Sequence, residues 1–449
     1  MINKMSFTEE YNKKLVTAEE AAKAVKSGDW VEYGQFVTQT QDVDKALAKR
    51  KDELEDVKIR ATTRATPLAV LEADPNQEVF TYNNHHFSGY DRKLQDNGQS
   101  FFIPLNYHEQ PRYYRENNEL DVAILGVTPM DEKGFFNFST SVASSRSMVD
   151  AAKTVILEVN PNLPYVYGGL NESVHISEVD YLVEVDWKPV EVPSAKASEE
   201  DKKIASLIID RIEDGATIQL GIGGMPNAIG EMIAQSDLKD LGIHTEMFVD
   251  SIVDMYNSGS VTGRKKNIDE GKIVFTFAMG TNKTYEFLHN NPAVASYSVD
   301  YVNHPSVIAQ IDNMVAINNA MEVDLYGQVS SESIGKRQIS GTGGQADFNT
   351  GAYESKGGQA FIAMTSSFVD RNGKRHSRIK NLLTPGSIVT VPRSQTSNIV
   401  TEYGIFNLKG KSTWERAEGL INLAHPDFRE ELIKEAQELG IWRPSNKRN

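Results

Sequence analysis

One carboxylate stands in an unusual context in the stretch GIHTEMFVDSIVDMYNSG, residues 242–259. Glu246 follows a threonine and leads directly into the apolar run MFV. Acidic side chains usually lie in solvated segments, so this one is either an ordinary loop residue or a reactive carboxylate in a protected site. Because the chain contains 62 Asp and Glu residues, the apolar neighbours favour a chemical role only modestly. The residues by themselves leave both interpretations open.

A glycine turn precedes this carboxylate in the segment LGIGGMPNAIGEMI, residues 220–233. The pattern predicts a strand end, a turn and a helix start, with Pro226 in the first helical turn. Free amides in such a turn can bind an anion or an oxyanion. Dinucleotide binding needs G-x-G-x-x-G, and Pro226 replaces the third glycine after Gly221 and Gly223. A purely structural turn is favoured by the pattern alone, with an anion site second.

A second glycine-rich segment is SGTGGQADFNTGAYESKGGQA, residues 340–360, with six glycines. Flexible linkers have this composition, but Phe348, Tyr353 and the apolar run that follows indicate an ordered loop. Glycines in an ordered loop permit positive φ and a close approach of the backbone. Taken alone, the segment is typical of a structural turn.

The histidines and serines offer little for metal binding or hydrolysis. None of the nine histidines forms H-E-x-x-H or another metal-ligand spacing, and no G-x-S-x-G elbow occurs. His244 is better explained as a packed or hydrogen-bonded neighbour of Glu246 than as a ligand. Because the chain has no cysteine, it has no disulfide, thiolate metal site or cysteine nucleophile. We therefore expect no bound metal.

Two pairs of segments resemble each other and predict an internal duplication. The stretch SGDWVEYGQF (27–36) resembles DGATIQLGIG (214–223), and DVAILGVTPMDEKGFFNFS (121–139) resembles MVAINNAMEVDLYGQVSSE (314–332). Glycine turns and apolar strands also recur by chance. Two pairs in the same order favour duplication.

Strands and helices alternate in each half of the chain. Near-continuous apolar runs are typical of strands covered on both faces, and capping pairs mark helix starts. The pattern predicts an α/β protein with two similar α/β domains and mostly parallel sheets. We place the domains at residues 1–190 and 191–449, joined near a linker at 186–200. The expected strands are 154–159, 217–222, 272–279, 313–318 and 387–392, and the capping pairs are Thr17 with Glu20, Ser198 with Asp201 and Ser412 with Glu415.

Length, charge and composition set the broad class. The 449 residues, 39% hydrophobic and 24% charged, suit two globular domains. A net charge of −15 disfavours nucleic acid as a partner, although a local site can still bind a small anion. No apolar run reaches the length of a membrane span, and the N-terminal stretch lacks the apolar core of a signal peptide. We expect a cytoplasmic homo-oligomer with no membrane partner.

The sequence resembles the class I coenzyme A transferases of the acetyl-CoA hydrolase/transferase family. The most specific stretches are HTEMFVD and GTGGQADF. Others are SGDWVEYG, GIGGMPNAIG, VNHPSVI, INNAMEVDLYGQV and VTEYGIFNLKGKSTWERAEGLINLAHPDFREEL. The resemblance covers nearly the whole chain. It implies two α/β domains with the active site between them.

The resemblance also assigns roles to particular residues. It implies that Glu246 is the catalytic nucleophile and that Asn303 and Gly344 form the oxyanion pair. A basic contact to CoA falls on Arg371, with Lys374 as the rival. The turn that contacts CoA and the oxyanion falls on Gly221, Ile222, Gly223, Gly224 and Met225.

The implied activity is transfer of CoA between butyryl-CoA and acetate through a glutamyl-CoA thioester. Acyl-CoA and short-chain carboxylates are then the substrates, and no cofactor is expected beyond the CoA thioester itself. 4-Hydroxybutyrate or propionate as the acid, or water as the acceptor in an acyl-CoA hydrolase, remain alternatives. A dinucleotide-dependent oxidoreductase and a non-catalytic CoA-binding protein are weaker ones, the former because of Pro226 and the latter because Glu246 and Asn303 are both present.

Overall fold

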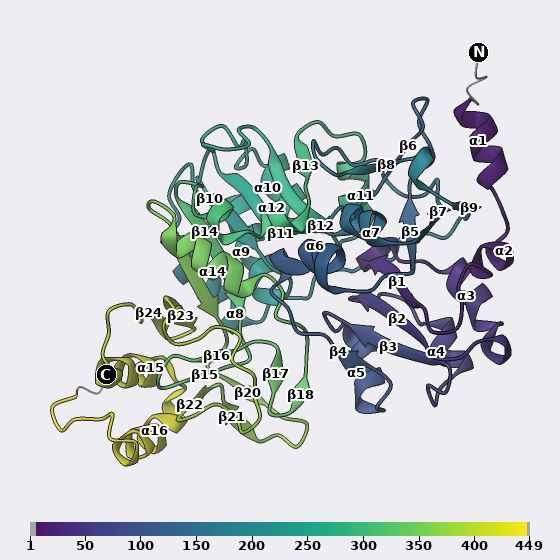
Figure 1. Cartoon of the computed structure of the whole chain (residues 1–449). Helices are drawn as coiled ribbons and strands as arrows, with labels where there is room; N and C mark the ends of the chain where they lie inside the picture. Colours follow the sequence, from purple (N-terminus) through teal and green to yellow (C-terminus); the bar gives the residue numbers. More distant parts are fainter. Residues whose placement is uncertain (1–5, 447–449) are drawn as a thin grey trace. The chain divides into compact units, whose positions relative to one another are not determined.

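The computed structural model describes residues 6–446 (Figure 1). Elements up to residue 193 are α1 (Phe7–Lys14), α2 (Ala18–Ala22), β1 (Trp30–Gln35), α3 (Asp42–Ala48), β2 (Val57–Thr62), α4 (Ala69–Ala73), β3 (Phe80–Asn84), α5 (Gly89–Asp96), β4 (Phe101–Phe102), α6 (Gln110–Arg112), β5 (Val122–Val127), β6 (Phe135–Asn137), α7 (Ser145–Ala151), β7 (Thr154–Val159), β8 (Ser173–His175) and β9 (Tyr181–Glu184).

The rest of the chain contains more elements than the first part. They are α8 (Glu199–Ile209), β10 (Thr217–Leu220), α9 (Gly224–Gln235), β11 (Gly242–Phe248), α10 (Asp250–Asn257), β12 (Ile273–Ala278), α11 (Asn282–Leu288), β13 (Val294–Ser296), α12 (Val299–Val302), α13 (Pro305–Ile308), β14 (Met314–Asn319), β15 (Glu322–Asp324), β16 (Val329–Ser330), β17 (Ser333–Ile334), β18 (Arg337–Gln338), α14 (Gln345–Glu354), β19 (Gln359–Ala363), β20 (Ser367–Val369), β21 (Arg375–Ser377), β22 (Ile379–Lys380), β23 (Asn398–Thr401), β24 (Gly404–Asn407), α15 (Thr413–Leu423) and α16 (Pro426–Glu438).

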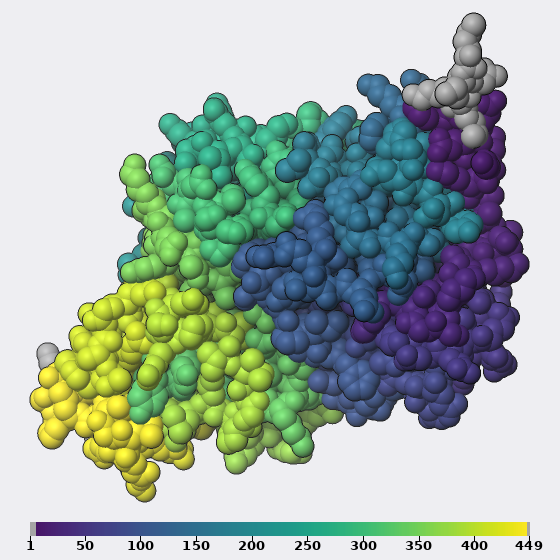
Figure 2. Space-filling view, viewed as in Figure 1, coloured from purple at the N-terminus to yellow at the C-terminus, as the bar shows by residue number. Residues whose placement is uncertain are grey.

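The described chain divides into two compact units. Unit 1 takes the residues up to Pro193 together with 247–249 and 274–302, and unit 2 takes the remainder. The predicted boundary between residues 190 and 191, and the predicted placement of the active site between domains, stay predictions. In the space-filling view, the C-terminal residues, coloured yellow, gather in one region of the surface, with green atoms of earlier residues among them (Figure 2).

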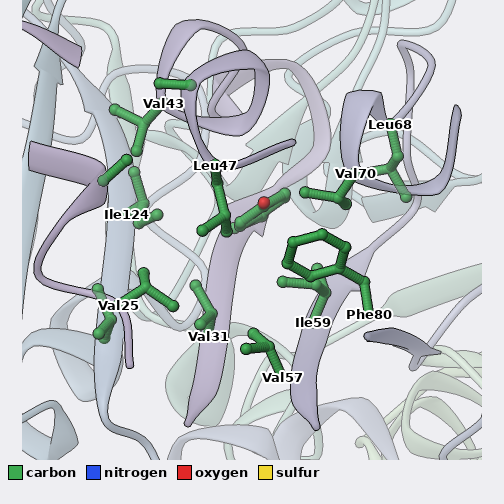
Figure 3. Packing of buried hydrophobic residues seen from close by; sticks show 14 of the residues in the cluster. Val25, Val31, Val43, Leu47, Val57, Ile59, Leu68, Val70, Phe80 and Ile124 are labelled. Carbon is green, nitrogen blue, oxygen red and sulfur yellow. The ribbon is translucent and has the colours of Figure 1, made fainter. Parts of the chain in front are cut away.

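Unit 1 is built on a seven-stranded sheet in the order β4-β3-β2-β1-β5-β7-β9, with every neighbouring pair parallel. Alternate residues of the central strands face one apolar core, where Val31, Ile59 and Phe80 meet Val43 and Leu47 of α3 (Figure 3). All five are fully buried. Burying such a side chain contributes about 1.5–3 kcal/mol, so this face fixes the sheet against its helices.

Unit 2 repeats the strand order of unit 1. Its strands β11-β10-β14-β19-β23 are neighbours in that order and all parallel, and β24 adds an antiparallel edge. Strand β10 therefore lies between β11 and β14, as β1 lies between β2 and β5. The sequence repeat pairs β1 with β10 and β5 with β14. The predicted fold class, two similar α/β domains with mostly parallel sheets, is confirmed.

A turn after the second repeated strand shows the duplication at atomic detail. Oδ1 of Asp131 accepts hydrogen bonds from the amides two and four residues later, at 2.8 and 2.9 Å. Oδ1 of Asp324 accepts the equivalent bonds at 3.0 and 2.9 Å. Gly134 and Gly327 occupy the same step of the turn with φ of +86° and +89°, a conformation that favours glycine.

Four of the five expected strands are present, and one is wrong. The segments predicted at 154–159, 217–222, 272–279 and 313–318 form β7, β10, β12 and β14. The segment 387–392 is irregular, and Val391 makes only an isolated bridge to Val329 within the described residues. Ile388 and Val389 are 50% and 39% exposed. The pairing with β16 is confined to Val329, and Pro392 directly after the bridge lacks an N–H, so the apolar run does not continue as a strand.

The predicted helix starts are confirmed. Ser198 and Ser412 form capping boxes with Asp201 and Glu415 at the starts of α8 and α15. Thr17 accepts a hydrogen bond from the amide of Glu20 at the start of α2. Such caps satisfy amides that the first helical turn leaves unpaired.

A buried carboxylate in β7 holds the start of α3. Glu158 is fully buried, and its Oε1 accepts from the amides of Asp42 and Val43 at 2.9 and 2.8 Å. Thr40 and Trp187 donate to the same carboxylate. Burial raises the pKa of Glu158, whereas these hydrogen bonds lower it.

We expect Glu158→Ala to lower the free energy of unfolding by about 2–4 kcal/mol, because each buried donor left unpaired costs about 1–3 kcal/mol. Urea unfolding measures the change. Asp42→Asn is the control, since Asp42 lies at the same helix end but its carboxylate is partly exposed and paired with Lys45. It should cost less than about 1 kcal/mol. An equal effect of the two variants would contradict the role of Glu158.

Candidate active site

Strand β11 carries Glu246 near its carboxyl end, where ligands of parallel sheets bind. The preceding residues His244 and Thr245 are fully buried, whereas Glu246 is half-buried. Thr245 Oγ1 donates to the carbonyl oxygen of Leu220 at 3.1 Å, which ties β11 to the end of β10. The carboxylate is thus fixed on a regular strand and is still partly accessible.

Asn303 makes the most direct side-chain contact with this carboxylate. Its Nδ2 donates to Oε2 of Glu246 at 2.6 Å. Asn303 is fully buried between the short helices α12 and α13, and Pro305 begins α13 two residues later. Because a carboxylate can only accept a hydrogen bond, the contact also fixes which side of the amide faces Glu246.

Gly344 supplies the second donor. It is the N-cap of α14, and its backbone N–H donates to the Glu246 carboxylate. A Cβ atom at this position would overlap both Oε2 of Glu246 and Nδ2 of Asn303. Its φ of −98° is open to any residue, so the backbone conformation does not demand glycine here. Glycine is required because only a residue without a Cβ allows this close approach.

The environment raises the pKa of Glu246 to about 7. Burial is the main cause, because it disfavours the charged form. The charge of Asp347, which is buried in the first turn of α14, raises the pKa further. The hydrogen bonds from Asn303 and Gly344 act in the opposite direction. Perturbed carboxylates of this kind concentrate at functional sites.

The glycine turn after β10 lies at the same sheet edge. Gly221 and Ile222 follow the strand, and Gly223 has φ +123° and ψ 177°, which only glycine adopts readily. Gly224 and Met225 begin α9, and within residues 6–446 no side chain caps this helix. The contact of residues 221–225 with CoA stays a prediction.

Two contacts missed by sequence reasoning join this turn to α14. Asn319, at the end of β14, donates from Nδ2 to the carbonyl of Ile222 at 3.2 Å. Gln345, the first residue of α14, donates from Nε2 to the carbonyl of Asn319 at 2.6 Å. Neither residue has a sequence signal, since amide side chains are common both at strand ends and at helix starts. Asp347 was missed too, although it follows Gly344 closely in GTGGQAD.

The predicted basic contact lies in a surface turn. Arg371 and Lys374 are exposed in the turn between β20 and β21, where the Asp370 side chain accepts from the Lys374 amide. Binding of CoA by Arg371 stays a prediction. The hydrogen bonds within the turn show only how its backbone is held.

His244 has the packing role expected from its sequence position. Its ring is buried against Phe348 of α14, with centroids 6.3 Å apart. Across residues 6–446, no group of three or more His, Asp or Glu side chains is arranged to hold a metal ion. In the same part of the chain, no helix is long and apolar enough to cross a membrane.

Two family models and several known proteins match the chain. Residues 1–193 and 280–436 match the models of the acetyl-CoA hydrolase/transferase N-terminal and C-terminal domains. The chain is 53% identical over 441 residues to a probable butyrate:acetyl-CoA coenzyme A-transferase from Syntrophomonas wolfei subsp. wolfei, covering 98% of each chain. It is 52% identical over 446 residues to the butyryl-CoA:acetate CoA-transferase of Anaerostipes caccae, covering 99% of this chain and 100% of the relative.

A solved structure also matches nearly the whole chain. The crystal structure of RipA from Yersinia pestis matches with a TM-score of 0.90 at 36% identity, covering 97% of this chain and 100% of that one. The resemblance carried by HTEMFVD and GTGGQADF is therefore confirmed over nearly the whole length. The chain belongs to the acetyl-CoA hydrolase/transferase family.

Proposed function

We propose that the protein is a CoA-transferase that moves CoA between butyryl-CoA and acetate, with Glu246 as the covalent nucleophile. The observation that carries the proposal is the half-buried Glu246 carboxylate, of raised pKa, that accepts from Asn303 and Gly344. The substrates are suggested by the relatives from Syntrophomonas wolfei and Anaerostipes caccae, which are 53% and 52% identical and are named for butyrate or butyryl-CoA and acetate.

The first half-reaction forms an anhydride and then a thioester. Oε1 of Glu246 attacks the carbonyl carbon of butyryl-CoA, and the C–S bond breaks to release CoA thiolate and leave a butyryl-glutamyl anhydride. The thiolate then attacks the glutamyl carbonyl carbon, and butyrate departs with the bridging oxygen. Acetate reverses both steps and leaves as acetyl-CoA. Thioester energy is conserved throughout, so the reaction needs no group beyond the CoA thioester.

The hydrogen bonds of the site suit the second attack. Oε2, which accepts from Asn303 at 2.6 Å, becomes the carbonyl oxygen of the anhydride and the negative oxygen when the thiolate adds. Donors already aimed at that oxygen stabilise the developing charge without reorganisation. The Gly344 N–H is the second donor to the same carboxylate. Water must be excluded throughout, because both acyl intermediates hydrolyse.

Initial-rate plots at varied butyryl-CoA and acetate should give parallel lines, as double displacement requires. The same assays with propionate, 4-hydroxybutyrate and crotonate define the acid range, since one methylene in an apolar pocket changes binding by only about 1–3 kcal/mol. Intersecting lines would show direct transfer in a ternary complex. CoA release without acetate at the transfer rate would instead show a hydrolase.

Incubation with butyryl-CoA alone should leave CoA on Glu246. Borohydride reduces a thioester but not a carboxylate, so treated enzyme should lose activity and yield a modified peptide containing Glu246. Glu246→Gln should bind acyl-CoA and fail to transfer, while melting no lower than wild type because it removes a buried charge. Glu246→Asp retracts the carboxylate and should transfer about 100-fold more slowly. Near wild-type transfer by Glu246→Gln, in protein shown to be free of deamidation, would exclude this nucleophile.

The rate should depend on the ionisation of Glu246. Only the carboxylate is nucleophilic, so kcat/KM for acyl-CoA should rise with pH through about 7, where an ordinary glutamate would already be ionised. Asn303→Ala removes a hydrogen bond that lowers this pKa. The acid limb of the profile, which is the rise of kcat/KM with pH, should therefore move to higher pH. Asn303→Ala should also lower kcat by about 100-fold, the usual effect of a lost oxyanion donor. An unchanged limb and unchanged kcat in folded Asn303→Ala would argue for a structural role alone.

A further inference from the structure

The loop before α14 presents the Gly344 N–H but has few side chains of its own. Residues 340–344 read SGTGG, and Gly343 has φ +58°. Glycines provide conformational freedom but no anchoring side chain. Helix α14 is held independently through Gln345 and the fully buried Phe348. Another part of the chain must fix the loop itself.

That part is Glu332, in the bend between β16 and β17. Its side chain is 2% exposed. Oε2 accepts from Thr342 Oγ1 at 3.2 Å and from Gln338 Nε2 at 3.2 Å, and Oε1 accepts from Thr390 Oγ1 at 3.0 Å. Thr342 lies in the centre of the glycine loop. The carboxylate thus joins that loop to two other segments of unit 2.

The backbone of Glu332 holds the same loop at its start. Its carbonyl oxygen accepts from the amides of Ile339 and Ser340 at 2.7 and 3.2 Å. Gln338 Nε2 also donates to the carbonyl of Ser340 at 3.1 Å. The loop is therefore fixed at residues 339–340 by the main chain of Glu332 and at Thr342 by its carboxylate, and Gly344 follows two residues later.

We propose that Glu332 is a positioning residue that holds the Ser340–Gly344 loop so that the Gly344 N–H faces the Glu246 carboxylate. The inference rests on the proposed function of Glu246. A carboxylate suits the position because it can accept from three neutral donors at once, whereas an amide would turn a donor toward one of them. Truncation at Glu332 leaves Thr342 without this anchor and frees the loop to shift relative to Glu246.

The chain offers a matched control. Glu322 on β15 is also buried, with 4% exposure, and its carboxylate accepts three hydrogen bonds from neutral donors, although the charge of Arg378 also acts on it. These are the amide and hydroxyl of Thr384 and the hydroxyl of Ser387, at 2.7–2.9 Å. Glu322→Ala removes a buried carboxylate of the same chemistry without touching residues 338–344. It controls for a general loss of packing in unit 2.

The experiment compares Glu332→Ala, Glu332→Gln, Thr342→Val and Glu322→Ala with the wild type in the transferase assay. Glu332→Ala should lower kcat by about 10- to 100-fold, because small misplacement of a catalytic group has effects of this size. KM for acyl-CoA should change less than about threefold, and the acid limb of kcat/KM should move to higher pH as the Gly344 hydrogen bond weakens. Glu332→Gln keeps the shape and should recover part of kcat.

Thr342→Val keeps the residue's shape and removes one donor to Glu332, so it provides a test if Glu332→Ala does not fold. It should lower kcat by about 3- to 10-fold with a nearly unchanged melting temperature, a smaller effect than the full misplacement. Glu322→Ala should melt lower but keep the wild-type kcat and acid limb.

If Glu246→Gln is inactive, the proposed function stands, and two results would then overturn the role of Glu332 alone. One is a folded Glu332→Ala or Thr342→Val with kcat and acid limb within twofold of wild type. The other is an equal loss of kcat in Glu322→Ala. Full transfer by Glu246→Gln would overturn the proposed function and this inference together, so the two failures are distinguishable.

Discussion

The approach of Gly344 and Asn303 to the Glu246 carboxylate is the constraint on which the site depends. Three segments of unit 2 must meet where no Cβ would fit. The contact requires a glycine at the N-cap of α14, which is Gly344, and an amide of fixed orientation at Asn303. Burial destabilises the charge that these donors stabilise, and the pKa near 7 records the balance between the two effects. Small shifts of any one segment therefore change the environment and the pKa of this carboxylate.

The duplicated fold uses buried carboxylates in two different ways. In unit 1, Glu158 at the end of β7 is saturated by hydrogen bonds from Thr40, Trp187 and the start of α3. Such a group stabilises the fold, because its oxygens already accept hydrogen bonds from the protein and are buried away from any substrate. In unit 2, Glu246 accepts from two donors and stays half-buried. The two carboxylates therefore differ in how many hydrogen bonds they accept and in their access to solvent, which is the difference expected between a structural group and the proposed nucleophile.

The elements were predictable from the sequence where local physics decides them. Apolar runs identified β7, β10, β12 and β14, and capping pairs identified α8 and α15. The repeat around Asp131 and Asp324 predicted a duplication whose turns match bond for bond. The failure at 387–392 shows the limit, since a strand needs a partner as well as apolar residues.

The site was less predictable because its members meet only through the fold. Glu246 and Asn303 are 57 residues apart, and neither stands out among similar residues by composition. Their pairing came from family resemblance. The bracing by Asn319, Gln345 and Glu332 depends on which strand ends and bends lie side by side, and spacing along the chain carries no trace of it. Arg371 illustrates the converse, since its place in a basic turn does not show whether it contacts a ligand.

The desolvation of Glu246 acts on more than its pKa in the proposed mechanism. Ionised Glu246 places a negative charge in a largely buried position, and Asp347 adds to the cost. The anhydride and the glutamyl-CoA thioester are neutral at this residue, so their formation removes that charge. The environment that destabilises the free carboxylate therefore favours the covalent intermediate relative to the resting enzyme. Asn303, the donor to Oε2, acts in the tetrahedral state between them, where negative charge returns to that oxygen. In this mechanism, burial and Asp347 favour loss of the Glu246 charge on acylation, whereas the hydrogen-bond donors stabilise the negative oxygen formed when the thiolate attacks the glutamyl carbonyl.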